Sequence, residues 1–483
     1  MTRYILSLLA MTFAILSVAQ NGLNLDVTLD NYDSDTLYLG YYFGDKTYLA
    51  DTAYADAPGH FVFQADTLAD AGVYLLVLHP SNNYTELLLP EGDQQFSVQT
   101  DANDMVGGMS FGGSPENKVF YDYMNYLGSL RPKAQTIQQQ MANADPDTQA
   151  RLQEELAKLD EEVRSLQEKI VQENEGSLVA GIIAANMNLE MPEFEGTEEE
   201  KQYQRFYYTR DHYFDNIDLT DSRMLRTPFL FNRVETYIDK LTIQVPDSVI
   251  QSVDYLLQEM KPSRELFRYY LIHFLNKYAG SKVVGMDAVY VHLAQNYYGK
   301  GMATWTDEEQ LQKILDNAEK IAPLLIGEKA PNIRMQKRDG TPVELYDVNS
   351  QYTVLYFWRY DCGHCKKSTP YMKEFYEQFK DQDVTLMAAC LKFTDEVEGC
   401  WEYIDDNELN GWLHTVDPYG RSQFHKKYDL RTTPQIYILN RDKEIVMKKI
   451  GAEQLPEVMN KLMEMRSEES RVGKECATGC RSR

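Results

Sequence analysis

The chain has 483 residues, 43% of them hydrophobic, and its 74 acidic side chains exceed its 48 basic ones to give a formal net charge of −26. This length is too great for a single hydrophobic core, and this hydrophobic content excludes a disordered protein, so several folded domains are expected. The negative charge repels nucleic acids and anionic membranes, and neither is expected as a partner.

Residues 1–19 have the pattern of a secretory signal peptide. Arg3 precedes an apolar run from Tyr4 to Val18, and small residues lead to a predicted cleavage site after Ala19. The run is short for a membrane anchor, and no later segment reaches a spanning length. No cysteine follows the small residues, which argues against a lipid anchor. The sequence therefore predicts a protein exported to the periplasm, with no stable membrane span.

Residues 20–113 form the first predicted domain. Short runs rich in β-branched and aromatic residues, such as "LDVTL", "TLYLGYYF" and "VYLLVL", alternate with Asn, Asp, Gly and Pro turns. This pattern predicts a β-rich domain, a small antiparallel sandwich or barrel.

Residues 114–322 form the second predicted domain, which is α-helical. Ser114 and Pro115 have the order of a helix start. Two apolar stripes follow, from Phe120 to Met141 and from Leu152 to Ile170. They fit either an intramolecular αα-hairpin or a dimeric coiled coil, and the short break between them favours the hairpin while leaving a homodimer open.

The histidines of this helical region give no metal site. His212, His273 and His292 each lack a second ligand at metal spacing, so packing or surface positions are expected and no metal is predicted.

Residues 323–465 form the third predicted domain, in which strands and helices alternate as in an α/β fold. Strands are expected at 352–358, 383–391, 435–439 and 443–450, and helices at 363–380, 395–408, 419–428 and 454–464. The whole chain is thus a multidomain α+β protein with a C-terminal α/β domain. Residues 466–483 break the preceding pattern and are predicted to be a non-native tail.

All six cysteines lie in the last third of the chain, so they do not form a disulfide scaffold. Cys362 and Cys365 stand between a predicted buried strand and a helix. A zinc site needs four ligands, and Cys390 and Cys400 lack a second C-x-x-C spacing. A purely structural disulfide bond between Cys362 and Cys365 would span only one helical turn and would add little stability. Redox chemistry is therefore the favoured interpretation.

The position of Cys362 predicts a reactive thiol. Unpaired N–H groups and the helix dipole favour a thiolate there, so its pKa should fall below the free value of about 8.5. Cys365 follows nearly one turn later and is the predicted resolving thiol. His364 can stabilise the thiolate and make the disulfide more oxidising. Cys390 and Cys400 are expected to be free core thiols rather than a pair.

Three segments carry a resemblance: residues 327–331, "LYFWRYDCGHCKKSTPYM" and "YDLRTTPQIYILN". Residues 327–464 resemble the thioredoxin superfamily, in particular the exported TlpA/ResA-like thiol–disulfide oxidoreductases. The resemblance implies a thioredoxin fold, a cis peptide before Pro434, a substrate groove lined by Thr433, and Trp358 beside the active site. The Cys-Gly-His-Cys tetrapeptide containing Gly363 is the one found in protein disulfide isomerases. No cofactor is implied.

The chain departs from the family at two positions. Tyr356 stands where thioredoxin has a buried carboxylate, and Ser368 where ResA-like proteins have a glutamate. Proton transfer to Cys365 is thus left to water, Tyr356, His364 or another acid. A peroxiredoxin is rejected, because no Pro-x-x-x-Thr-x-x-Cys precedes Cys362.

Residues 24–112 and 200–326 resemble two uncharacterised domain families that are fused ahead of thioredoxin domains in exported proteins of Gram-negative bacteria. The expected function is disulfide exchange with exported thiol- or disulfide-bearing proteins, with a redox partner that recharges the cysteine pair. The alternative is a binding or scaffold protein whose thioredoxin-like domain only senses redox state. The direction of exchange is left open between reduction, oxidation and isomerisation.

Overall fold

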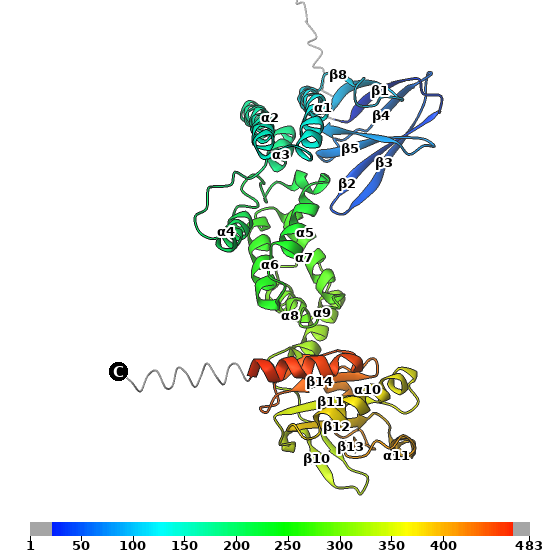
Figure 1. Cartoon of the computed structure of the whole chain (residues 1–483). Helices are drawn as coiled ribbons and strands as arrows, with labels where there is room; N and C mark the ends of the chain where they lie inside the picture. Colours follow the sequence, from blue (N-terminus) through cyan, green and yellow to red (C-terminus); the bar gives the residue numbers. More distant parts are fainter. Residues whose placement is uncertain (1–21, 467–483) are drawn as a thin grey trace, which may run out of the picture. The chain divides into compact units, whose positions relative to one another are not determined.

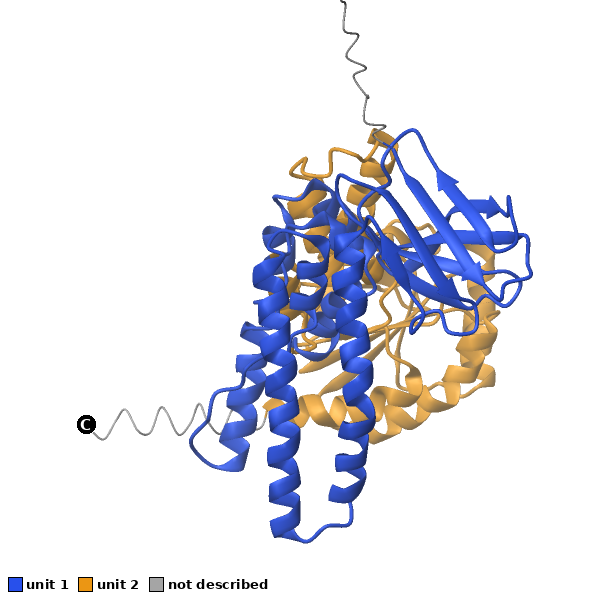
Figure 2. Ribbon diagram, turned by 90° about the horizontal axis from the view of Figure 1, so that it is seen from above, with its two compact units in different colours: residues 1–242, 255–269 blue, residues 243–254, 270–483 orange. Residues whose placement is uncertain are grey.

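The computed structural model describes residues 22–466 (Figure 1). The predicted signal peptide lies outside the described residues, as does all but the first residue of the predicted tail. By their internal contacts the described residues divide into two compact units, coloured separately in Figure 2. One unit holds residues up to Thr242 together with Tyr255–Tyr269, and the other holds Ile243–Asp254 and the residues from Tyr270 onward.

The first unit begins with a β-sandwich. One sheet has the order β4-β1-β7-β8, with β1 Asn24–Asp30, β4 His60–Gln64, β7 Gln95–Asp101 and β8 Ser110–Gly112. The other has the order β3-β2-β5-β6, with β2 Thr36–Phe43, β3 Lys46–Tyr54, β5 Gly72–Leu78 and β6 Tyr84–Leu89. Alternate residues of β1 (Leu25, Val27 and Leu29) are buried in the core between the sheets.

The sequence suggested an antiparallel sandwich, but the observed sandwich also contains one parallel pair of strands. β1 pairs with β7 in parallel, from Asn24 opposite Gln95 to Asp30 opposite Asp101. Alternation within a strand reports which face is buried but carries no information about the direction of its neighbour, which is why this expectation was wrong.

Two long helices pack against each other as an αα-hairpin. α1 (Pro115–Met141) and α2 (Pro146–Glu173) share a small core of Ile137, Leu152 and Leu159. Inside the first turn of α1, the Asn117 amide accepts from the Leu88 N–H and donates to the Leu88 carbonyl, both at 2.7 Å. The helix start is thereby fixed to strand β6.

The remaining helices are shorter. They are α3 (Leu178–Ala185), α4 (Glu198–Asp211), the 3₁₀ turn η1 (Ser222–Arg226), α5 (Leu230–Lys240), α6 (Pro246–Met260), α7 (Arg264–Ala279), α8 (Asp287–Leu293), the π-helical turn η2 (Ala294–Tyr298) and α9 (Glu308–Ile321). The division between the two units runs through α6 and α7. No helix within residues 22–466 is long and apolar enough to cross a lipid bilayer.

The second unit ends in a seven-stranded mixed sheet of order β10-β9-β13-β12-β11-β14-β15. Its strands are β9 Arg334–Gln336, β10 Pro342–Glu344, β11 Tyr352–Trp358, β12 Val384–Cys390, β13 Leu413–Val416, β14 Gln435–Leu439 and β15 Ile445–Lys448. Its helices are α10 Gly363–Phe379, α11 Val397–Asp406, α12 Phe424–Lys427 and residues 455–466. The helix expected at 419–428 is thus reduced to four residues.

β11 is an interior strand of this sheet, parallel to β12 on one side and antiparallel to β14 on the other. All seven of its residues are buried, because both faces of the sheet are covered. Val354, Tyr356 and Trp358 face one core, whereas Leu355 and Phe357 face the other. The carboxyl end of this buried strand therefore leads to the start of α10.

Candidate redox site

The cysteine pair lies where β11 ends and α10 begins. Cys362 is the N-cap residue of α10 and has extended backbone angles, and its Sγ accepts a hydrogen bond from the Cys365 N–H at 3.2 Å. Cys362 is partly exposed, whereas Cys365 is buried, and both are free thiols. A sulfur atom here takes the place that a Ser or Asp oxygen takes in an ordinary N-cap.

The surroundings of Cys362 favour its charged form. Burial opposes ionisation, but hydrogen bonds from the side chains of Cys365 and Thr433 and from the backbone of the first helical turn outweigh it, so the pKa of Cys362 falls. Backbone N–H groups at a helix start are well placed to solvate an anion. At a given pH, a larger fraction of this sulfur is therefore the nucleophilic thiolate than in a free thiol.

Cys365 has the opposite character. Burial, followed by the adjacent Cys362 sulfur, raises the pKa of Cys365 to about 12. Its side chain lies in the core beneath α10, with Met372 and Phe375 of the same helix. The pair thus consists of an accessible sulfur that ionises easily and a buried sulfur that does not.

A segment distant in sequence completes the surroundings of Cys362. The Thr433–Pro434 peptide bond is cis, as the resemblance implies. The Cys362 Sγ lies 3.4 Å from the Thr433 carbonyl oxygen, to which a thiol can donate. Thr433 and Pro434 are half-buried, just before β14.

The other predicted site residues near the cysteine pair differ in their exposure to solvent. Gly363 and His364 are exposed in the first turn of α10. Trp358 is buried, and its ring centroid lies 5.4 Å from that of Tyr403 in α11. The Nε1 of Trp358 has no hydrogen-bond partner within residues 22–466.

Tyr356 lies in the same core as Cys365, two residues before Trp358 on the same face of β11. It is 2% exposed, and its hydroxyl has no hydrogen-bond partner among residues 22–466. Burial, then the nearby Cys365 sulfur, raises the pKa of Tyr356 far above its usual range, so the hydroxyl keeps its proton. A buried hydroxyl without a partner is costly and calls for an explanation.

A charged cluster beside the pair was not found from the sequence. Asp361 pairs with Arg359 at 2.8 Å and with Lys392 at 3.0 Å, and Lys392 also pairs with Glu396 at 2.9 Å. Arg359 and, against some burial, Lys392 hold the pKa of Asp361 far below its usual range. The cluster neutralises the carboxylate next to Cys362, which would otherwise disfavour a thiolate. Its sequence signal was the local Arg359-x-Asp361 pair; Lys392 lies too far along the chain to be linked to it.

The expectation that Cys390 and Cys400 are free thiols was wrong. They form a disulfide, with Cα atoms 6.4 Å apart. Cys390 is the last residue of β12, opposite Trp358 of β11, and Cys400 lies in α11, which returns over the same core. The connecting residues bring the two sulfurs together, and a spacing of ten residues does not reveal this.

No group of three potential ligand side chains among residues 22–466 is placed to hold a metal ion. Two of the helical-region histidines have carboxylate partners instead. His212 lies 2.7 Å from Asp215, and His292 lies 2.8 Å from Asp254.

Family models match three parts of the chain. The AhpC/TSA family matches residues 326–448, and two domains of unknown function, DUF4369 and DUF5106, match residues 23–120 and 153–322. The thiol-disulfide oxidoreductase ResA of Bacillus cereus (strain ATCC 10987 / NRS 248) is 26% identical over 206 residues, which cover 42% of this chain and 99% of the relative. ResA of Bacillus subtilis (strain 168) is 39% identical over 63 residues, which cover 13% of this chain and 35% of the relative.

Solved structures are similar as well. A domain of a possible thiol-disulfide isomerase from Cytophaga hutchinsonii ATCC 33406 is 34% identical, with coverage of 30% of this chain and 99% of that one and a TM-score of 0.29. A thioredoxin-like protein from Bacteroides caccae ATCC 43185 is 18% identical, with coverage of 56% and 96% and a TM-score of 0.43.

The C-terminal part of the chain is a thioredoxin-like domain of the AhpC/TSA family, preceded by DUF4369 and DUF5106 domains. The protein is an oxidoreductase of the thioredoxin-like class.

Proposed function

We propose that the protein exchanges disulfides with other proteins through Cys362 and Cys365. The observation that carries this proposal is the asymmetry of the pair: Cys362 is accessible and has a lowered pKa, whereas Cys365 is buried and has a raised one. A nucleophile needs an accessible thiolate, and a resolving thiol needs to lie within reach of it while staying shielded until the mixed disulfide has formed.

The reaction takes two steps. The Cys362 thiolate attacks a substrate disulfide, forming a mixed disulfide and releasing one substrate sulfur as a thiolate, which takes up a proton. Cys365 then loses its proton and attacks the Cys362 sulfur, which releases the second substrate sulfur. Two electrons pass from the pair to the substrate, and a second thiol protein restores the reduced pair. The reverse sequence oxidises a substrate dithiol.

The second step requires an anion at Cys365, which burial disfavours. Tyr356 keeps its proton and has no other partner among the described residues, so its hydroxyl is our candidate donor to this anion. A hydrogen bond to a buried charge is worth about 1.5–3 kcal/mol. Tyr356 would thereby assume part of the role of the carboxylate that thioredoxin has at this position.

The neighbouring residues have supporting roles in the proposal. The half-buried Thr433 and Pro434 line the substrate groove beside the Cys362 sulfur, where an extended substrate segment would lie. The exposed His364 and Gly363 tune the redox potential from the first turn of α10, and Trp358 supports the pair from within the core.

We place this activity in the periplasm, reached through the predicted signal peptide. The two upstream modules, proposed at 20–113 and 114–322, would hold or select exported client proteins. The pattern of residues 1–19 and the acidic composition support an exported protein without nucleic-acid partners.

Reduction of insulin by the full chain with dithiothreitol as electron source tests the proposal. Turnover should be lost in Cys362→Ser and retained in the Cys390→Ser/Cys400→Ser double variant, which removes the other pair. An inactive but folded wild-type protein would contradict the enzymatic proposal and favour a redox-sensing scaffold.

A further inference from the structure

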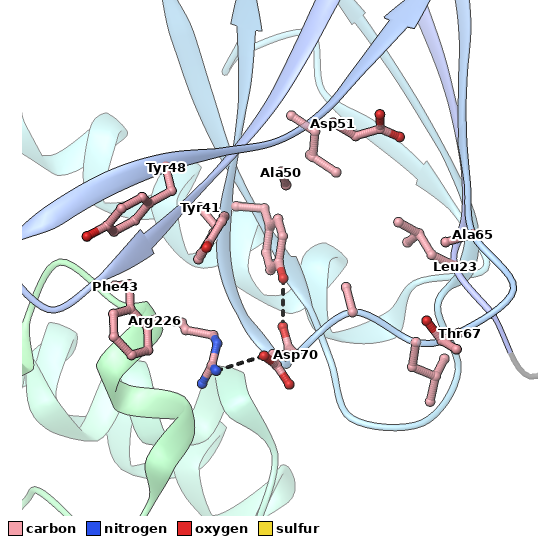
Figure 3. A pocket seen from close by; sticks show the side chains of 14 residues that line it. Leu23, Tyr41, Phe43, Tyr48, Ala50, Asp51, Ala65, Thr67, Asp70 and Arg226 are labelled. Atoms are coloured by element: carbon pink, nitrogen blue, oxygen red, sulfur yellow. Dashed lines mark hydrogen bonds and ion pairs between the residues drawn. The ribbon is translucent and has the colours of Figure 1, made fainter. Parts of the chain in front are cut away.

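The β-sandwich contains a cavity of about 490 Å³ that disulfide exchange does not use (Figure 3). Tyr41 and Tyr74 form an aromatic wall, with ring centroids 5.9 Å apart, and Tyr48 of β3 stacks on Tyr41 at 5.6 Å. Leu23 and Leu39 add apolar surface. This size and lining suit one large apolar side chain with room for its neighbours.

One end of the cavity is polar and negatively charged. The Arg226 guanidinium, 9% exposed, lies 2.8 Å from both Asp70 and Glu265. Its Cζ atom lies 5.3 Å from the centroid of the Phe43 ring, so the guanidinium already has two carboxylate partners and one aromatic partner. Among the charged residues that line the cavity, Arg226 is basic whereas Asp70 and Asp51 are acidic, and Asp51 lies at the part of the rim formed by β3. A ligand with a basic group complements this charge.

Strand β3 borders the cavity and is unusually open. It is the edge strand of its sheet, with β2 as its only partner strand among the described residues. Residues 45–51 are exposed without interruption, although successive side chains of a strand point to opposite faces. Leu49 is 63% exposed and Tyr48 is 44% exposed. Edge strands are usually protected from pairing, and apolar residues on a free edge mark a docking surface.

We propose that β3 and the adjoining cavity bind an extended segment of a client polypeptide in which apolar and basic residues alternate. The segment adds as a strand along the free edge of β3 and places one apolar side chain in the cavity against the ring of Tyr41, with a basic side chain near Asp51. A free edge presents backbone donors and acceptors at the repeat of another polypeptide, which a sugar does not match. This proposal adds a client-binding site to the proposed function. It rests on the proposed function only in taking the bound polypeptide to be a substrate of disulfide exchange.

Two substitutions test separately the contribution of the cavity and the contribution of the negative charge at its rim to peptide binding. Ala50 is exposed on β3 and lines the cavity, so Ala50→Trp fills the space without disturbing the core. Asp51→Lys reverses the charge of the rim. Asp33→Lys is the matched control, because Asp33 is an exposed carboxylate of the same sandwich that does not line the cavity.

The experiment measures fluorescence anisotropy of a labelled, cysteine-free peptide of alternating leucine and lysine, titrated with the full-length reduced chain. Saturable binding is expected, weakened at least about tenfold by Ala50→Trp, which is about 1.4 kcal/mol. Asp51→Lys should weaken it similarly and favour a leucine–glutamate peptide instead, whereas Asp33→Lys and Cys362→Ser should bind as the wild type does.

Equal affinity in wild type and Ala50→Trp would overturn the proposal, as would an equal loss in Asp33→Lys, which would indicate unspecific charge attraction. A dimer in analytical ultracentrifugation that Leu49→Lys dissociates would assign the edge to a second copy instead. Because the peptide has no cysteine, a failure here leaves disulfide exchange untouched.

Discussion

The start of α10 and the β12–α11 segment each hold a cysteine pair, and both pairs pack against one hydrophobic core. At the start of α10 one sulfur is partly exposed and accepts a backbone hydrogen bond, and the pair is reduced. In the β12–α11 segment both sulfurs are buried and joined, Cys390 at 1% and Cys400 at 0% exposure. Exposure and the helix terminus, not the presence of two nearby cysteines, separate an exchanging pair from a structural bond.

The largest expected effect is on turnover. In Cys365→Ser the first step remains but the second cannot occur, so insulin reduction should fall more than about 100-fold, a free-energy change of about 2.7 kcal/mol. A mixed disulfide between Cys362 and insulin should accumulate, seen by non-reducing electrophoresis and mass spectrometry. Normal turnover without this adduct would show that Cys365 is not the resolving thiol.

The buried pair should affect stability instead. For its ten-residue separation, loss of the Cys390–Cys400 bond in a double alanine variant should lower the free energy of unfolding by about 2–3 kcal/mol. Urea unfolding of the oxidised wild type and the variant measures this difference. Insulin turnover of the folded variant should stay within about twofold, and a large loss of turnover would place this pair in the reaction.

The Tyr356→Phe variant keeps the ring and removes the hydroxyl. Resolution of the mixed disulfide should slow roughly tenfold, because the Cys365 anion loses a donor, while formation of the mixed disulfide is unchanged. The pH at which resolution is half-maximal should rise, since the Cys365 thiolate becomes harder to form. Stopped-flow measurement of both steps from pH 6 to 10 tests this.

A purely structural Tyr356 would give a different pattern. Both steps would change together, with no displacement of the pH profile. The free energy of unfolding should not fall in Tyr356→Phe, because the hydroxyl has no partner among the described residues.

The smallest expected effect is on the reduction potential of the active-site cysteine pair. His364→Pro removes the side chain that we propose stabilises the thiolate form, so the reduction potential of the Cys362–Cys365 pair should fall by tens of millivolts, where about 30 mV corresponds to 1.4 kcal/mol. Equilibration with glutathione buffers measures it, with His414→Gln as a histidine control distant in sequence. An unchanged potential would remove His364 from the tuning role.

Local patterns predicted the position of the cysteine pair well. The apolar run of β11 followed by Cys362 predicted a buried strand that ends at a helix start, and the structure has strand Tyr352–Trp358 and helix Gly363–Phe379. The β-rich runs similarly predicted strands such as β1, which the structure has at Asn24–Asp30. Both are properties of consecutive residues.

Three features that join distant segments were not predicted. The Cys390–Cys400 bond depends on where α11 returns over the sheet, and the contact of Lys392 with Asp361 depends on β12 lying beside β11. The parallel pairing of β1 with β7 is of the same kind. Spacing along the chain does not encode these contacts, because tertiary packing decides them.

The most direct test of the account is the pH dependence of alkylation of each cysteine in the reduced full-length chain, followed by peptide mass mapping. A thiolate forms as the pH rises through the pKa, so the lowered pKa of Cys362 predicts half-maximal reaction below about pH 8.5, with Cys365 nearly unreactive at neutral pH. Half-maximal reaction of Cys362 at or above the free-thiol value, or equal reactivity of the two cysteines, would contradict the account.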